Sequence, residues 1–375
     1  MAFGHRRVPG SLLDVMYAYR EREERGFEGA PPVTNPVPLR RSTFRTHDRL
    51  SGLILGSAIG DALGMPVEGL DNDQTLRAIH RLGGIRHFVA PQPHVLRSLR
   101  RLRPGCWTDE TQLVLEITRS IIEYRTLDYD GVSLAMVRAF ENLELRGWDP
   151  VTKQGCRRLA QGTHRLRSGK LGGDGNAVAA RIAPIAAWSF MRQESREQLL
   201  EHCFNVGVMT HHDARAITGA YLIALLIRDA LGSPRRWEPS QERYQELIEE
   251  ARWAESVLAQ RIGTTDDPLS EHLNELEDAL DSDSVELAEL CNGATTYACH
   301  SISYCIALLL GRAWDFEEGI IAAVNGGGDT DTNAAIVGAV LGAACGARKL
   351  PRLFAERLEE VEIIRGVGER FADIF

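Results

Sequence analysis

The strongest chemical pattern in this chain of 375 residues is a run of glycines followed by alternating acids near residue 330. Residues 326–328 are glycines, Asp329, Asp331 and Thr332 follow, and an alanine-rich stretch comes next. Two carboxylates and a hydroxyl within one turn suit Mg²⁺, Mn²⁺ or Ca²⁺. Val340 stands where an EF-hand needs its glutamate, and no P-loop Gly-Lys-Ser/Thr follows. A helix cap needs only one such residue, so we favour a ligand site.

A second acidic motif lies at residues 108–111, at the head of a strongly amphipathic stretch. Asp109 and Glu110 could bind a cation, but acids in a first turn also favour the helix dipole, and the motif by itself does not separate these two roles.

A third motif contains Asp61, which interrupts an apolar, glycine-spaced helix, and Glu68, which follows Pro66. A buried acid needs a partner, and either a cation or backbone amides would serve Asp61. If these motifs from both ends of the chain converge in one cleft, their carboxylates repel one another unless cations neutralise them. Two metal ions about 3.5–4 Å apart would polarise a ligand and activate water.

The elements that must position these residues are predicted to be helices almost throughout. Alanine-rich periodic segments recur from about residue 48, strand-like alternation is scarce, and residues 84–96 are typical of an irregular loop. We therefore predict an all-α fold with one compact multi-helix domain over residues 48–375. We predict that residues 1–47 form an N-terminal arm, with a short helix from Ser11 to Arg25 followed by a proline-rich connector.

Composition disfavours several other classes. The net charge of −9 argues against nucleic acid as the main partner. The chain contains no uninterrupted apolar stretch of about 18 residues, so we expect no membrane span. Its start lacks the pattern of a secretory signal. The seven cysteines include no Cys-x-x-Cys pair, which favours reduced thiols in a cytoplasmic protein.

Charge is unevenly distributed along the chain. Residues 77–103 hold seven arginines, no lysine and no acid, whereas residues 266–289 hold ten acids and no lysine or arginine. A solvated helix face accounts for the acidic run. The arginine run leads into the motif at residues 108–111 and suits a phosphate-bearing ligand or an acidic partner.

In this order, the motifs resemble those of the ADP-ribosylglycohydrolase family, also called the dinitrogenase reductase-activating glycohydrolase family. The matching stretches, which span residues 52–344, are GLILGSAIGDALGMPVEG, PGCWTDETQL, GNAVAARIAPIA, MTHHDARAITGAY and NGGGDTDTNAAIVGAVLGA. The resemblance implies an all-α fold with two Mg²⁺ ions, or Mn²⁺ in their place, and ADP-ribose bound over them.

The resemblance also assigns roles to individual residues. It implies metal ligands at six positions: Thr108, Asp109, Glu110, Asp329, Asp331 and Thr332. It implies catalytic roles for Glu68, as general acid/base or gate, and for Asp109. It implies substrate contacts at six more: Gly175, Asn176, His211, Gly326, Gly327 and Gly328. From the residues alone, His211 is equally well explained as a packed histidine at a helix end.

Two positions depart from the family pattern. Glu110 stands where an aspartate is usual, which shifts a ligand oxygen by one methylene. Ala177 stands where a glycine commonly follows the asparagine, which narrows the expected ribose pocket.

Two functions remain open at this stage. The first is a hydrolase that removes ADP-ribose from a modified protein side chain, with the N-glycosidic linkage to arginine as first hypothesis and serine, another protein group or a free small molecule as alternatives. The second is a binding protein that occludes a partner through residues 1–47. Similar proteins with an added N-terminal segment act as immunity factors against ADP-ribosyltransferase toxins, so such a toxin is the expected partner.

Overall fold

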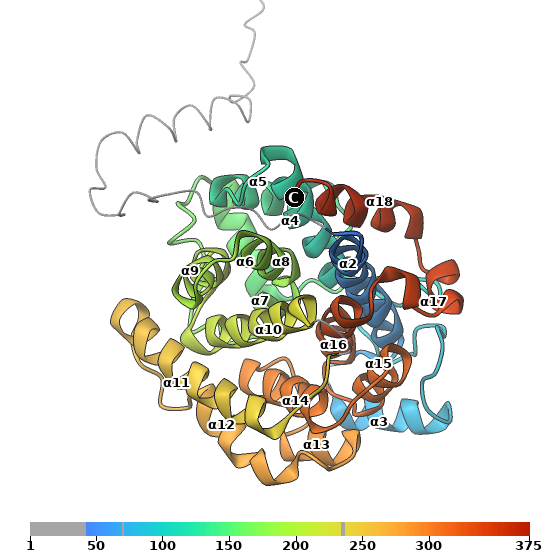
Figure 1. The fold of residues 1–375 in the computed structure, drawn as a ribbon. Helices are drawn as coiled ribbons and strands as arrows, with labels where there is room; N and C mark the ends of the chain where they lie inside the picture. Colours follow the sequence, from blue (N-terminus) through green and yellow to red (C-terminus); the bar gives the residue numbers. More distant parts are fainter. Residues whose placement is uncertain (1–42, 70, 234–236) are drawn as a thin grey trace, which may run out of the picture. The chain divides into compact units, whose positions relative to one another are not determined.

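The computed structural model describes residues 43–69, 71–233 and 237–375 (Figure 1). The predicted arm lies outside this part of the chain except for its last residues, so its helix, its connector and its toxin contact stay predictions. Helix α2 (Phe44–Gly64) includes residues 44–47, and Thr43 caps it by accepting a hydrogen bond from the Thr46 amide.

The prediction of an all-α fold is confirmed. After α2 the described helices are α3 (Asn72–Arg81), α4 (Asp109–Tyr124), α5 (Tyr129–Asn142), α6 (Pro150–Ala160), α7 (Ala177–Ala180), α8 (Ala183–Arg192), α9 (Arg196–Gly207), α10 (Ala214–Gly232), α11 (Gln241–Ile262), α12 (Leu269–Glu275), α13 (Ser284–Leu290), α14 (Ala298–Gly311), α15 (Phe316–Asn325), α16 (Thr330–Cys345), α17 (Arg352–Arg357) and α18 (Val361–Ala372). Short 3₁₀ helices occur at η1 (Met65–Val67), η2 (Glu277–Ala279) and η3 (Ala347–Lys349). The described chain has one sheet, in which β1 (Lys170–Leu171) pairs in parallel with β2 (His211–His212).

Helices α2 and α16 pack against each other in antiparallel orientation, and they lie side by side in Figure 1. Glycines at every fourth position of α2 allow this approach. A Cβ at Gly52 would lie 2.4 Å from the Gly342 carbonyl oxygen, and one at Gly60 would lie 1.9 Å from that of Ala334. These distances are too short for any side chain, so the two backbones are in direct contact.

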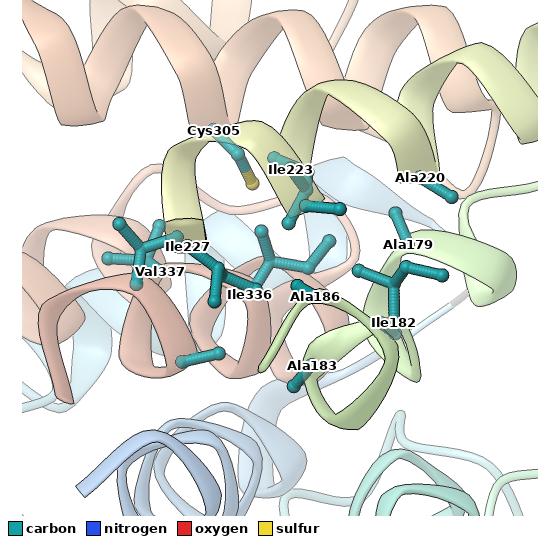
Figure 2. Close-up of a cluster of buried hydrophobic side chains, with 14 of the residues drawn as sticks. Ala179, Ile182, Ala183, Ala186, Ala220, Ile223, Ile227, Cys305, Ile336 and Val337 are labelled. Atoms are coloured by element: carbon teal, nitrogen blue, oxygen red, sulfur yellow. The ribbon is translucent and has the colours of Figure 1, made fainter. Parts of the chain in front are cut away.

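A second interface covers α16 on its other side. Helices α7, α8, α10 and α14 contribute small and branched apolar side chains there, and Figure 2 shows Ile223 and Ile227 of α10 among Ile336 and Val337 of α16. All four of these side chains are at most 1% exposed. Helix α16 is therefore enclosed, and the residues at its first turn are placed inside the protein.

One described helical segment, Phe44–Val67, is long and apolar enough to cross a membrane by length and composition alone. Its most apolar window is entirely buried within the protein, where it packs against α16. Burial of this kind is what the central helix of a globular core requires, so the segment is weak evidence for a membrane span.

Candidate active site: a buried cluster of acids

Three helix ends bring five acids together. Glu68 follows η1 at the end of α2, Asp109 and Glu110 open α4, and Asp329 and Asp331 open α16. One carboxylate oxygen each from Glu68, Asp329 and Asp331 lie within 4.8 Å of one another. Thus the predicted convergence of motifs from both ends of the chain is observed.

Two threonines join the motif at α4 to the motif at α16. The Thr332 hydroxyl donates to Glu110 Oε1 at 2.7 Å, and the Thr108 hydroxyl lies 3.4 Å from Asp331 Oδ2. The longer side chain of Glu110 thus reaches across to α16, although an aspartate is usual at its position. Both threonines are buried, so all six predicted ligand residues lie in or beside the cluster.

The cluster lacks compensating positive charge. Glu68 Oε2 and Glu110 Oε2 are buried and have no hydrogen-bond partner. Within the described ranges, none of the five acids forms an ion pair with lysine, arginine or histidine. Buried like charges without counterions are unfavourable, so this part of the protein is incomplete by itself.

The acids hold their protons more strongly than usual for the same reason. Burial raises the pKa of Glu110 to about 8, despite the stabilising hydrogen bond from Thr332. Burial also raises the pKa of Asp331 and Glu68 well above the ordinary range, and their neighbouring carboxylates raise it further. The pKa of Asp109 rises through burial and through the charge of Glu110.

Asp61 has a different role from the five acids. Its two oxygens accept hydrogen bonds from the amide and hydroxyl groups of Thr108 and Thr111, at 2.5–3.0 Å. Of the two partners considered for Asp61, the protein's own amides are the ones observed. This carboxylate therefore fixes the start of α4 against α2, although burial raises its pKa to about 6.

Asn176 borders the cluster from the loop before α7. Its Nδ2 donates to Asp329 Oδ2 at 2.7 Å and to Ser301 Oγ at 2.9 Å, and its backbone amide donates to Thr296 O. Both side-chain hydrogens are thereby used, so the amide can offer a ligand only its carbonyl oxygen. That oxygen is an acceptor, as recognition of a sugar hydroxyl requires. The next residue, Ala177, is 7% exposed.

His211 belongs to β2 and is 1% exposed. The Arg181 Nη2 donates to the Thr210 hydroxyl, whose oxygen lies 2.8 Å from His211 Nδ1. Thr210 is fully buried, and among the described contacts Nδ1 is the one acceptor for its hydroxyl hydrogen. Nδ1 therefore accepts, and the ring proton lies on Nε2, which faces Gly175. Burial lowers the pKa of His211 to about 4, so the ring is neutral.

The three glycines before Asp329 are needed by the protein's own packing. A Cβ at Gly326 would lie 2.2 Å from the Tyr304 hydroxyl, and one at Gly328 would lie 2.3 Å from the backbone of residues 293–294. Gly327 and Gly328 also have positive φ angles of 83° and 74°. Their predicted contact with a ligand stays a prediction.

Sequence reasoning missed Asp149, the N-cap of α6. Its Oδ1 accepts from the amides of residues 151 and 152, while its Oδ2 is buried without a partner. Its charge contributes to the raised pKa values of Asp109 and Glu110. The signal was the Asp-Pro pair, which predicts a helix start but not that the carboxylate contributes to the electrostatics of the acid cluster.

The donor set fits hard divalent cations. Carboxylates and threonine hydroxyls supply oxygen ligands, which Mg²⁺ and Mn²⁺ prefer, and two buried carboxylate oxygens lack any other partner.

A polar loop beside clustered acids with raised pKa values supplies groups that an enzyme can use for acid–base chemistry. The model of the ADP-ribosylglycohydrolase family matches residues 42–375, so this chain belongs to that family. Membership supports an activity that removes ADP-ribose from a modified substrate.

Individual relatives match over most of their lengths. An uncharacterized protein of Archaeoglobus fulgidus is 29% identical over 88% of this chain and 97% of its own. The ADP-ribosylhydrolase ARH3 of Bos taurus is 24% identical, with 85% and 90% covered, and the ADP-ribosylarginine hydrolase Tri1 of Serratia proteamaculans is 22% identical, with 91% and 83% covered. A solved structure described as an ADP-ribosylglycohydrolase-related protein complex has a TM-score of 0.65 at 24% identity, covering 88% of this chain and 99% of that one, and supports the fold.

Proposed function

We propose that this protein is a hydrolase dependent on two divalent cations, Mg²⁺ or Mn²⁺, that removes ADP-ribose from a modified arginine side chain of a protein. The observation that carries the proposal is the cluster of five acids, four of them buried and Glu68 partly exposed, without counterions. Thr108, Asp109, Glu110, Asp329, Asp331 and Thr332 would hold the cations. Bound there, the cations supply Lewis acidity and neutralise the repulsion among the carboxylates.

Besides the cations, the reaction needs water as the nucleophile and a group that carries a proton. The bond between C1″ of the ribose and the guanidinium nitrogen breaks, the oxygen of water bonds to C1″, and the leaving nitrogen receives a proton. Glu68 is suited to this proton transfer because its Oε2 has no partner and burial raises its pKa.

Two neighbouring groups would orient the substrate. The carbonyl oxygen of Asn176 can accept a hydrogen bond from a ribose hydroxyl, because both hydrogens of its amide are already used. The Nε2–H of His211 can donate to a substrate oxygen. Arginine as the acceptor is supported by the name of the Serratia relative, at 22% identity.

The decisive experiment follows the release of ADP-ribose by chromatography. The full chain is incubated with proteins ADP-ribosylated on arginine or on serine, in Mg²⁺, in Mn²⁺ and in EDTA, beside an Asp329→Ala control. We expect release from arginine that depends on a cation. Release from serine alone would show that serine, not arginine, is the acceptor residue. Equal release in EDTA would refute the dependence on cations. No release from any substrate would refute the hydrolase function.

A further inference from the structure

An irregular segment anchors itself directly beside Glu68. The Gln92 amide donates to Pro66 O at 2.8 Å, and His94 Nε2 lies 3.0 Å from Val67 O. A small apolar cluster, separate from the main core, fixes the segment further; its buried members are Met65, Val95, Leu99 and Cys106. Residues 92–106 therefore pack on η1, which leads into Glu68.

Four exposed arginines project from this segment within seven residues: Arg97, Arg100, Arg101 and Arg103. We call residues 97–103 the arginine turn. Consecutive turns, with Leu99 N bonded to Leu96 O and Leu102 N bonded to Leu99 O, keep it compact. The Nε of Arg100 donates to Val95 O at 2.9 Å, which ties that side chain to the protein.

The arginine turn carries unpaired positive charge. None of its four arginines forms an ion pair with an acid in the part of the chain that the structure describes. Arginines on other elements pair with nearby acids: Arg138 with Glu123, Arg252 with Glu249, and Arg365 with Glu362. Other exposed arginines of the described chain, such as Arg125 and Arg352, also lack an ion pair, so the distinguishing feature of the turn is that four such arginines lie within seven residues.

The arginine turn also belongs to the segment that packs beside Glu68, the one acid of the cluster that is partly exposed. Asp109, Glu110, Asp329 and Asp331 are at most 7% exposed, whereas Glu68 is partly exposed. A large modified substrate that approaches the cluster past Glu68 therefore meets the segment that packs on η1.

We propose that the arginine turn binds acidic residues of the polypeptide that carries the ADP-ribose, and so selects protein substrates with carboxylates near the modified side chain. This inference rests on the proposed function. Guanidinium groups bind carboxylates with two parallel hydrogen bonds, and the turn contains arginine without lysine.

The size and surroundings of the patch favour a short acidic segment over a nucleic acid. Seven residues span at most about 25 Å even when extended, and these form tight turns. Beyond residues 77–103 the chain is strongly negative, since that segment contributes seven positive charges to a total of −9. A long polyanion would be repelled outside the patch.

The first experiment measures binding without hydrolysis. Fluorescence anisotropy compares an unmodified acidic peptide, a neutral peptide of the same length and a single-stranded RNA oligomer on the full-length wild type. We expect the acidic peptide to bind most tightly, and its affinity to fall as NaCl is added. Equal binding of the two peptides, or tighter binding of the RNA, would overturn the proposal. Because no reaction is needed, this result is independent of whether the protein hydrolyses ADP-ribose.

The second experiment removes the charge. The triple variant Arg97→Glu, Arg101→Glu, Arg103→Glu leaves Arg100 in place because that side chain bonds to the backbone. We expect KM for an acidic ADP-ribosylated peptide to rise about tenfold with kcat unchanged, while KM for a neutral one stays the same.

The matched control changes the same charge elsewhere, with Arg138→Glu, Arg252→Glu and Arg365→Glu on α5, α11 and α18. It should keep the preference for the acidic peptide. If the first triple variant is poorly folded by circular dichroism, the milder Arg97→Gln, Arg101→Gln, Arg103→Gln variant replaces it. A preference retained by the glutamine variant, or lost equally in the control, would refute the role of the turn.

Discussion

The two ends of the α2–α16 pair differ in what they need from outside the protein. Along most of their length, glycines and alanines bring the helices into direct backbone contact. Where α2 ends and α16 begins, the same helices present carboxylates with buried, unpartnered oxygens.

This difference separates residues that maintain the fold from residues that perform chemistry. A larger residue in the glycine contact separates two closely packed helices, so it should lower the free energy of unfolding. A change among the acids removes repulsion that the fold tolerates, so it should cost activity and spare the structure.

The largest effect is expected at the glycine contact. Gly60→Ala places a Cβ 1.9 Å from the Ala334 carbonyl, so the helices must separate, and the free energy of unfolding should fall by at least about 3 kcal/mol. Chemical denaturation measures this. Gly366→Ala is the control, because its Cβ would meet nothing within 4 Å inside α18, and it should be neutral or stabilising. Equal effects at both positions would contradict the account of the contact.

Removal of one acid should have the opposite profile. For Asp331→Ala we expect turnover to fall by about 10³ while the fold is kept, because the cations lose a ligand. In EDTA the variant should melt at a higher temperature than the wild type, since one buried carboxylate is gone. A lower melting temperature in EDTA would show that Asp331 stabilises the fold. Asp373→Ala serves as the control, because Asp373 is an exposed acid that follows the last residue of α18.

Glu68 tests whether the cluster contains a proton carrier. Glu68→Gln keeps the shape but cannot exchange a proton, so turnover should slow by about 10² while affinity for ADP-ribose stays within a few fold. Single-turnover kinetics and calorimetry measure the two quantities. Unchanged turnover would assign Glu68 a structural role.

A smaller effect is expected from the residue that orients His211. Thr210→Val removes the hydrogen bond to Nδ1 and should lower turnover by about tenfold, whereas Thr210→Ser should retain it. Nitrogen NMR of the ring should show the proton on Nε2 in the wild type and a mixture of tautomers in the valine variant. The Nδ1–H form in the wild type would exclude this arrangement.

The smallest effect concerns stability and pH without cations. The pKa of Glu110 is raised from 4.5 to about 8, so its contribution to stability is fully present below 4.5 and is lost as pH rises toward 8. The melting temperature in EDTA should therefore fall across this window. Saturating Mg²⁺ should raise it by about 5 °C at pH 8 and by less at pH 5. The same rise at both pH values would contradict the linkage.

The sequence alone was sufficient to predict the helices and the acids that begin them, because both depend on local patterns. The periodic segments became helices, and Asp109, Glu110, Asp329 and Asp331 were recognised by their place at helix starts. The sequence was not sufficient to predict which side chains become neighbours when distant helices pack. The influence of Asp149 on the pKa values of Asp109 and Glu110, for example, depends on where α6 is placed.

The same limit applies to side chains that act through another residue. Nothing in the sequence near residue 181 indicates that Arg181 fixes the proton of His211 through Thr210. Asp61 illustrates an intermediate case, since the need for a partner was predictable but the choice of amides over a cation was not.

The antiparallel pairing of α2 with α16 also bears on how the protein is made. Gly64 and Thr330, which touch across the pair, are 266 residues apart in the chain. At roughly 5–20 residues per second, a ribosome takes about 13–53 s to go from the end of the first of these helices to the start of the second. For that time α2, which is long and apolar enough to resemble a membrane segment, lacks its main partner α16. Exposed apolar segments of nascent chains are prone to aggregate, so we expect the yield of folded protein to depend on chaperones that bind nascent chains.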